Sequence, residues 1–253
     1  MPLALLTVPC LKDNYAFLLH DEGTGRTALV DAPEAPPIRA ALDARGWRLT
    51  DILLTHHHPD HVDGVAELRD GARVVGAEAD AHRLPPLDLA VRPDQTFEVL
   101  GEEARVIDVS GHTVGHVAFH LPASGYLFSG DSLMALGCGR LFEGTPAQMW
   151  DSLRALRALP PETTVCSGHE YTLGNARFAL SVDGGNAALR ARADAVAGAR
   201  DRGEPTVPSS LAEEVATNPF LRADDPGLAA AMGLPGRPAA EVFAALRAAK
   251  DRF

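Results

Sequence analysis

Four residues within a six-residue stretch carry side chains that bind metal ions. The stretch follows the pattern H-x-H-x-D-H, and its candidate ligands are His56, His58, Asp60 and His61. Imidazole nitrogens and carboxylate oxygens are the ligands that a borderline divalent metal such as zinc takes. No single small-ion site needs four such ligands so close together. The spacing therefore suggests two adjacent metals, each completed by residues from later in the chain.

The segments on either side of this motif predict how it is held. The apolar run at residues 51–55 precedes it and is typical of a buried strand. Residues 61–68 follow it and predict the opening of a helix. The motif therefore lies at the exit of a strand, where α/β proteins place their ligand sites. This setting argues against the alternative, a solvated polar loop or an adventitious histidine cluster.

Three further candidate ligands each come directly after a glycine that ends a predicted strand: His112, Asp131 and His169. A glycine before the ligand lets the backbone turn sharply as the strand ends. We therefore expect these side chains to complete the metal site. His57 alternates with the ligands and should point away from the metals, and His116 fits a packing role better than a ligand role.

The remaining pattern divides the chain into a strand-rich part and a helical part. Strands are predicted at 3–8, 15–20, 26–31, 51–55, 72–76, 96–100, 104–109, 117–121, 126–129 and 163–166. Helices are predicted at 38–45, 147–159, 175–181, 187–202, 210–216 and 239–249, whereas 200–208 and 223–238 look like loops. The sequence Ser210-Leu-Ala-Glu213 is a candidate capping box. We predict a catalytic domain over residues 1–173 and a small helical domain over residues 174–253.

Composition narrows the class of protein. The net charge of −11 argues against nucleic acid as a partner, and an anionic substrate would need a locally basic pocket. No apolar run approaches the length of a membrane span, and we interpret the N-terminal segment, residues 1–10, as a first strand and not a signal peptide. Three widely spaced cysteines form no disulfide framework, so we expect a reducing cytoplasm.

The ligand motifs, in this order, resemble those of the metallo-β-lactamase superfamily. Within it, further segments resemble glyoxalase II, the hydroxyacylglutathione hydrolases, and this similarity runs from the first strands to the last residue. The segments are 11–15 (LKDNY), 137–140 (GCGR), 143–145 (EGT), 168–172 (GHEYT), 217–222 (TNPFLR) and 247–253 (RAAKDRF).

The resemblance implies an α/β fold, a four-layer αββα sandwich, with a C-terminal helical domain that binds glutathione. It also implies two divalent metal ions, zinc above all, with iron or manganese as alternatives. Carried over to this sequence, the first metal would be held by His56, His58 and His112. The second would be held by Asp60, His61 and His169, and Asp131 would bridge the two.

The resemblance further implies hydrolysis of S-(2-hydroxyacyl)glutathiones, chiefly S-D-lactoylglutathione, to D-lactate and glutathione. A metal-bridging hydroxide would attack the thioester, with Asp60 and Asp131 as the catalytic carboxylates. The leaving thiolate needs little help from a general acid. The substrate contacts would be Arg140, Tyr171, Arg247 and Lys250. Arg140 and Phe142 depart from the lysine and tyrosine of the eukaryotic pattern, so a related thiol carrier stays open.

Other activities of the same fold are the alternatives. A mononuclear iron persulfide dioxygenase would need one metal and no long helical tail. A lactone or β-lactam hydrolase would share both metals but not the basic pair in the tail. A non-catalytic metal-binding protein would be expected to have lost ligands. We expect a monomer.

Overall fold

The computed structural model of the chain describes residues 3–253, so the first two residues of the predicted N-terminal segment lie outside it. The chain divides into two compact units. Unit 1 contains the residues up to Asp108 together with Gly115–Gly130, and unit 2 contains Val109–Val114 together with Asp131–Phe253. Each unit is described by itself below.

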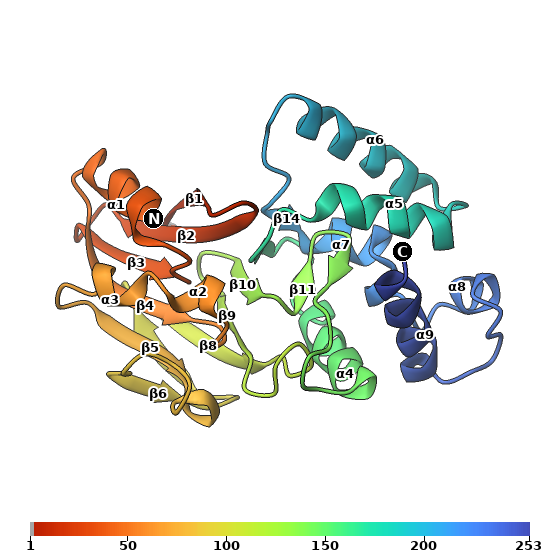
Figure 1. The fold of residues 1–253 in the computed structure, drawn as a ribbon, viewed down its shortest axis with the longest axis horizontal. Helices are drawn as coiled ribbons and strands as arrows, with labels where there is room; N and C mark the ends of the chain where they lie inside the picture. The colour runs from red at the N-terminus through yellow and green to blue at the C-terminus, as the bar shows by residue number, and fades with distance from the viewer. Residues whose placement is uncertain (1–2) are drawn as a thin grey trace. The chain divides into compact units, whose positions relative to one another are not determined.

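The first sheet of unit 1 has six strands in sequential order (Figure 1). They are β1 (Ala4–Cys10), β2 (Asn14–Asp21), β3 (Arg26–Val30), β4 (Arg48–Leu54), β5 (Arg73–Ala77) and β6 (Leu89–Val91). The first three strands pair antiparallel and the last four pair parallel, because β3 and β4 are joined through a helix and not by a tight turn. Ile52, Leu53 and Leu54 of β4 are fully buried, as expected for a parallel strand in a sheet interior.

Helices cover one face of this sheet. They are α1 (Ala35–Asp43) and two short helices, α2 (Pro59–Val62), which contains Asp60 and His61 of the histidine-rich motif, and α3 (Val65–Leu68). Ile38 and Leu42 of α1 join Leu18, Leu29 and Ile52 of the sheet in one buried cluster. The predicted single helix after the motif is interrupted at Gly64, where a Cβ atom would lie 2.9 Å from the Glu34 carbonyl carbon. A β-carbon does not fit there, so glycine is required. The Gly64 amide donates to the Ala32 carbonyl at 2.8 Å, outside the helix, where the two short helices meet.

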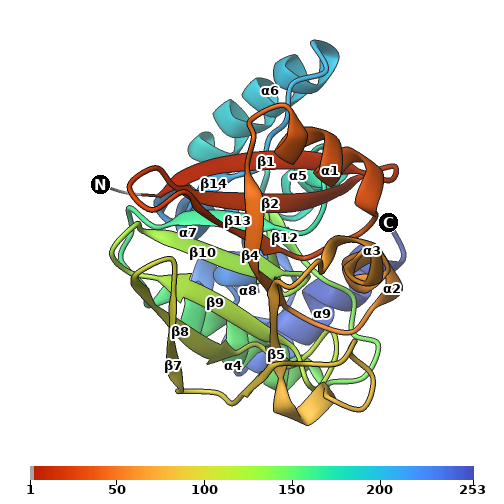
Figure 2. The ribbon, with the colours of Figure 1, turned by 90° about the vertical axis from the view of Figure 1, so that its left-hand side faces the viewer.

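The second sheet of unit 1 is an antiparallel series of β7 (Thr96–Val99), β8 (Glu102–Asp108), β9 (Val117–Leu121) and β10 (Tyr126–Gly130) (Figure 2). It packs on the first sheet: the rings of Phe17 on β2 and Phe128 on β10 lie 5.7 Å apart. The loop between β8 and β9 and the end of β10 are the strand exits that the sequence assigned to His112 and Asp131.

Unit 2 combines helices with two short strand pairs, β11 (Leu133–Met134) with β12 (Gly137–Cys138), and β13 (Thr164–Ser167) with β14 (Ser209–Ser210). Its helices are α4 (Pro146–Arg157), α5 (Thr172–Asp183), α6 (Ala187–Asp201), α7 (Leu211–Thr217), α8 (Pro226–Ala231) and α9 (Ala239–Asp251). A 3-10 turn, η2 (Pro219–Leu221), follows α7. Phe220 in this turn packs against Phe178 of α5 and Phe243 of α9 and so joins three helical segments.

Most predicted strands and helices are confirmed to within a few residues, and Pro146 opens α4 as expected. The prediction of a loop over 223–238 was wrong, because α8 begins there behind the N-cap Asp225. The strands β6, β11, β12 and β14 were missed, since two- and three-residue strands carry too little pattern. Among the described residues, no helix is both long and apolar enough to cross a membrane.

Candidate metal centre

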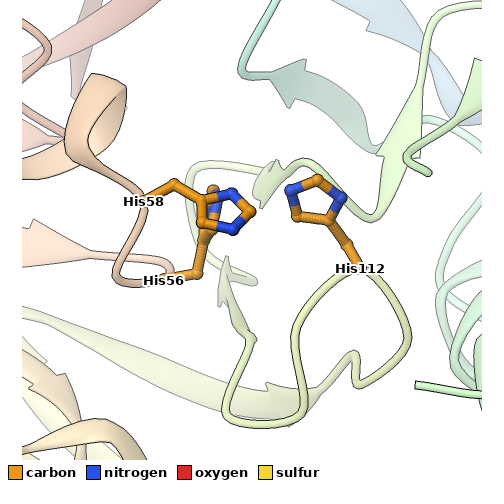
Figure 3. Close-up of side chains that lie close together, drawn as sticks. All are labelled: His56, His58 and His112. Carbon is orange, nitrogen blue, oxygen red and sulfur yellow. The ribbon is translucent and has the colours of Figure 1, made fainter. Parts of the chain in front are cut away.

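The histidine-rich motif of unit 1 spans the loop after β4, which carries His56 and His58, and the helix α2, which carries Asp60 and His61. His56 and His61 are buried, whereas His58 and Asp60 are partly exposed. His56 Nε2 and His58 Nδ1 lie 3.1 Å apart, and a ligand nitrogen of His56 lies within 4.8 Å of one of His61. Asp60 Oδ2 lies 3.8 Å from His61 Nε2. Figure 3 shows His56 and His58 on this loop, and His112 on the loop after β8.

A buried aspartate that the sequence analysis missed orients two of these histidines. Asp31, at the end of β3, accepts hydrogen bonds from the Thr55 amide (2.9 Å), the Thr55 hydroxyl (2.8 Å) and His61 Nδ1 (2.9 Å). Because the Thr55 hydroxyl donates to Asp31, it accepts from His56 Nδ1 at 3.1 Å. Both histidines therefore carry their proton on Nδ1 and direct the Nε2 lone pair outward as a ligand. Asp31 adopts φ +56°, a strained conformation that these three bonds maintain.

The non-ligand histidines of the motif region have structural partners. His57 Nδ1 lies 2.9 Å from Asp80 Oδ2, and Asp80 also accepts from Arg83. The carboxyl group of Asp80 packs against Gly115, where a Cβ atom would lie 2.2 Å from its Cγ. The ring of His116 stacks on that of His56, with centroids 4.5 Å apart and planes 11° apart. These contacts fit the predicted roles of His57 and His116 outside the ligand set.

Unit 2 holds the other three candidate ligands in contact with one another. Asp131 Oδ2 lies 3.4 Å from His112 Nε2 and 3.3 Å from His169 Nε2, and all three residues are buried. His112 Nδ1 donates to the Arg140 carbonyl at 2.8 Å, so its Nε2 is again the ligand nitrogen. A single carboxylate oxygen thus faces two imidazole nitrogens, as a bridging carboxylate would.

These distances match the coordination of a small divalent ion. Bonds of about 2.0–2.1 Å in a tetrahedron place neighbouring ligand atoms about 3.3 Å apart. The separations within each unit are 3.1 Å for His56–His58, and 3.4 and 3.3 Å for the two pairs with Asp131. The donors are imidazoles and carboxylates without a thiolate, a set that suits zinc, iron and manganese. The residues therefore fit the metals that the sequence predicted.

The predicted substrate contacts differ in exposure. Arg140 and Tyr171 are exposed, and the Tyr171 ring stacks on His169 with centroids 4.6 Å apart. Lys250 is partly exposed, and its Nζ donates to the Gly174 carbonyl at 3.0 Å. Burial and the neighbouring charges of Arg247 and Arg140 lower the pKa of Lys250. The three cations therefore form a local basic group in an acidic chain.

Arg247, also a predicted substrate contact, is bonded within the protein. Its side chain is 5% exposed, and Nη1 donates to the Cys138 carbonyl at 2.9 Å while Nη2 donates to Asp251. Most of its donors are thus used within the protein, and it holds the segment that leads to Arg140.

The three cysteines supply no nucleophile. Cys10, Cys138 and Cys166 are all buried, and none of them forms a disulfide. Burial raises the pKa of Cys10 to about 12 and that of Cys138 to about 11, and it also raises the pKa of Cys166. At neutral pH these groups are neutral thiols, as expected for the structural role predicted for Cys138 and Cys166.

Comparison with known proteins agrees with the ligand pattern. The metallo-beta-lactamase superfamily model matches residues 13–169, and the model of the hydroxyacylglutathione hydrolase C-terminus matches residues 170–253. A hydroxyacylglutathione hydrolase of Ruegeria pomeroyi is 64% identical over 100% of both chains.

Solved structures confirm the predicted fold class. A B3 metallo-beta-lactamase, BLEG-1, superimposes with a TM-score of 0.67 at 20% identity, over 86% of this chain and 99% of that one. The di-iron-bound form of TTHA1623 superimposes with a TM-score of 0.60 at 27% identity, over 86% and 99%. The chain therefore has the metallo-β-lactamase fold and belongs to the hydroxyacylglutathione hydrolase family.

Proposed function

We propose that this protein is a hydroxyacylglutathione hydrolase that cleaves S-D-lactoylglutathione to D-lactate and glutathione. The observation that carries the proposal is the 64% identity to a hydroxyacylglutathione hydrolase over the whole chain. The intact set of seven candidate ligands supports it, because a chain without the chemistry would have no need to keep them. A cytoplasmic monomer is part of the same proposal.

The seven candidate ligands would hold two divalent ions, most simply zinc. His56, His58 and His112 would hold the first ion, Asp60, His61 and His169 the second, and Asp131 would bridge them. When bound, the metals supply an activated water and a Lewis acid for the thioester carbonyl. The Oδ2 atom of Asp131 suits the bridging role because it faces His112 and His169 at almost equal distances.

The side chains around the centre orient the reactants. Asn14 Nδ2 donates to Asp60 Oδ2 at 3.0 Å and fixes the carboxylate that would align the attacking water. The leaving group is a thiolate whose parent pKa is about 8.5–9, so it departs without a protonated side chain beside it. This explains why a general acid is not required among the site residues.

Glutathione carries two carboxylates, and the basic group of Arg140, Arg247 and Lys250 provides the complementary charge. The guanidinium group of Arg140 can bind a carboxylate through two parallel N–H donors in a fixed plane, a geometry that the ammonium group of lysine does not provide. Tyr171, stacked on His169, places a phenol beside a proposed metal ligand. Phe142 is 63% exposed and lacks a hydroxyl, so it offers the substrate an apolar surface.

The test is hydrolysis of S-D-lactoylglutathione by protein whose metal content has been counted. We expect loss of thioester absorbance, release of one thiol per thioester, and about two metals per chain. The matched control is Asp131→Ala, which should release no thiol. Two bound metals without thioester cleavage would refute the assignment of substrate. One iron with oxygen uptake on glutathione persulfide would establish the dioxygenase instead.

A further inference from the structure

The loop between Asp131 and Arg140, which we name the ligand loop, is held from the C-terminal helical region. Every residue from Met134 to Gly139 has its backbone hydrogen-bonded to a side chain of that region. Asn218 donates to the carbonyls of Met134 (3.1 Å) and Gly137 (2.9 Å), and Asn175 donates to the carbonyl of Ala135 (3.0 Å). Arg247 donates to the carbonyls of Cys138 (2.9 Å) and Gly139 (3.5 Å). Glu214 accepts from the amide of Leu136 (2.9 Å).

Glu214 on α7 is the centre of this arrangement. It is fully buried, and Oε2 accepts from the Leu136 amide and from Asn218 Nδ2 at 3.1 Å. Its Oε1 accepts from the Ser209 hydroxyl at 2.6 Å and from Arg192. Leu136 has φ +56°, a conformation that a leucine adopts only where its surroundings enforce it. The bond from Glu214 supplies that enforcement.

The C-terminal end of the ligand loop contacts both candidate metal ligands. Gly139 packs on Asp131, at the start of the loop, so closely that a Cβ atom would lie 2.0 Å from the Asp131 carbonyl oxygen. The Gly139 amide also donates to the Ser132 carbonyl at 3.1 Å. The next residue, Arg140, accepts a hydrogen bond from His112 Nδ1 through its carbonyl. A shift of the loop therefore moves the backbone of Asp131 and the acceptor that orients His112.

We propose that Glu214 is a positioning residue for the reaction, acting through the ligand loop on Asp131 and His112. The C-terminal region then serves the metal centre as well as the substrate. This inference rests on the proposed function, since it requires that these two residues bind metal. Residues that hydrogen-bond to metal ligands and so orient them are typically important: their mutation lowers metal affinity or activity by roughly 10- to 100-fold.

The test uses Glu214→Gln in the metal-loaded enzyme. An amide cannot accept at both ends, so at least two of the four donors lose their acceptor whichever way it is turned. We expect EDTA to extract metal roughly tenfold faster and kcat to fall roughly tenfold. KM should change much less than kcat, because Arg140 and Lys250 keep their charges.

Thr217→Val is the matched control. Thr217 lies at the end of the same helix, is buried, and accepts from Arg192 Nη1 at 2.8 Å, but its hydroxyl contacts no residue of the ligand loop among the described hydrogen bonds. Its loss should lower the melting temperature without changing metal release or kcat. Asn218→Ser serves if Glu214→Gln does not fold, because serine can still cap the Phe220 amide but cannot reach Met134 and Gly137.

Three outcomes decide the matter. Fast metal release and low kcat in Glu214→Gln and Asn218→Ser, but not in Thr217→Val, support the proposal. Wild-type metal release and kcat in all folded variants overturn it while leaving the proposed function intact. A wild-type protein that neither binds metal nor cleaves the thioester overturns the proposed function, and this inference with it.

Discussion

The main-chain carbonyl of Arg140 accepts a hydrogen bond from Nδ1 of His112 over 2.8 Å. The residue proposed to bind a substrate carboxylate through its side chain thus orients a proposed metal ligand through its backbone. The two functions of this residue are chemically separable, because a substitution changes the side chain and keeps the carbonyl.

Arg140→Ala should therefore raise KM for S-D-lactoylglutathione and leave the metal content unchanged. Loss of a hydrogen bond between charged groups costs about 1.5–3 kcal/mol, which corresponds to an increase of roughly tenfold or more in KM. Steady-state kinetics and elemental analysis on the same sample check this. Loss of metal from the variant would contradict the assignment of the two roles.

Asp131→Ala should remove both metals together, because one oxygen of this carboxylate faces ligands assigned to different ions. Metal content per chain should fall from about two to well below one after dialysis. Asp131→Asn retains one oxygen and should keep more metal than the alanine variant. Retention of two full equivalents by Asp131→Ala would rule out the bridge.

Asp31→Asn should weaken metal binding roughly 10- to 100-fold, since the amide keeps only one acceptor oxygen and leaves at least one hydrogen bond from Thr55 or His61 unmade whichever way it is turned. Competition with a chelating dye measures the affinity. Asp51→Asn is the control: Asp51 is as deeply buried in the same sheet, and it accepts hydrogen bonds from Arg73 and Thr50, neither of which is a candidate ligand. Equal weakening in both variants would assign Asp31 a purely structural role.

The basic group should give the binding step an alkaline limit. An ordinary lysine has a pKa of about 10.5. The pKa of Lys250 is lower, so Lys250 loses its proton at a lower pH than an ordinary lysine does. An anionic substrate binds the protonated form, so KM should rise as the pH increases through that lowered pKa and stay constant below it. Lys250→Arg should move this rise in KM to higher pH. Lys250→Ala should abolish the rise and give a high KM at every pH. A pH-independent KM in the wild type would remove Lys250 from the substrate site.

Iodoacetamide should leave the native enzyme fully active at a pH of about 8, because the attacking species is the thiolate. The pKa values of about 12 for Cys10 and about 11 for Cys138 lie far above that pH, and all three thiols are buried. Mass spectrometry should find no labelled cysteine in the native protein and three in denaturant. Rapid inactivation with one label would identify a reactive thiol.

Local sequence patterns predicted most strands, helices and strand exits, and the family resemblance predicted the fold class. Apolar runs ending in a glycine and a ligand residue, as at His112 and His169, are signals confined to a few neighbouring positions. The helix α8 was not predicted because the glycines and prolines of residues 223–238 favoured a loop. The pair Asp225 and Pro226 is nevertheless a helix start signal, an N-cap followed by proline in the first turn. The capping box predicted at Ser210 is only half formed: Ser210 accepts from the Glu213 amide, while the Glu213 carboxylate lies 3.3 Å from Arg192.

Residues that orient the ligands could not be found in this way. Asp31 acts on Thr55 and His61, which lie 24 and 30 positions away, and Glu214 acts on Leu136, 78 positions away. No local spacing records such partners, and single buried carboxylates most often have structural roles. The ligand set, the substrate contacts and the boundary near residue 173 stay predictions of the sequence, to be tested by the experiments above.

The ligand loop is translated long before the side chains that fix it. Arg247 follows Cys138 by 109 positions, and Glu214 follows Leu136 by 78. During synthesis, residues 134–139 therefore lack these hydrogen-bonding partners until α7 and then α9 have been translated. A chain interrupted before α9 contains all seven candidate ligands but not the complete support of Asp131 and His112. The proposal therefore predicts that a fragment ending before α9 lacks part of the support that holds Asp131 and His112 in the full chain.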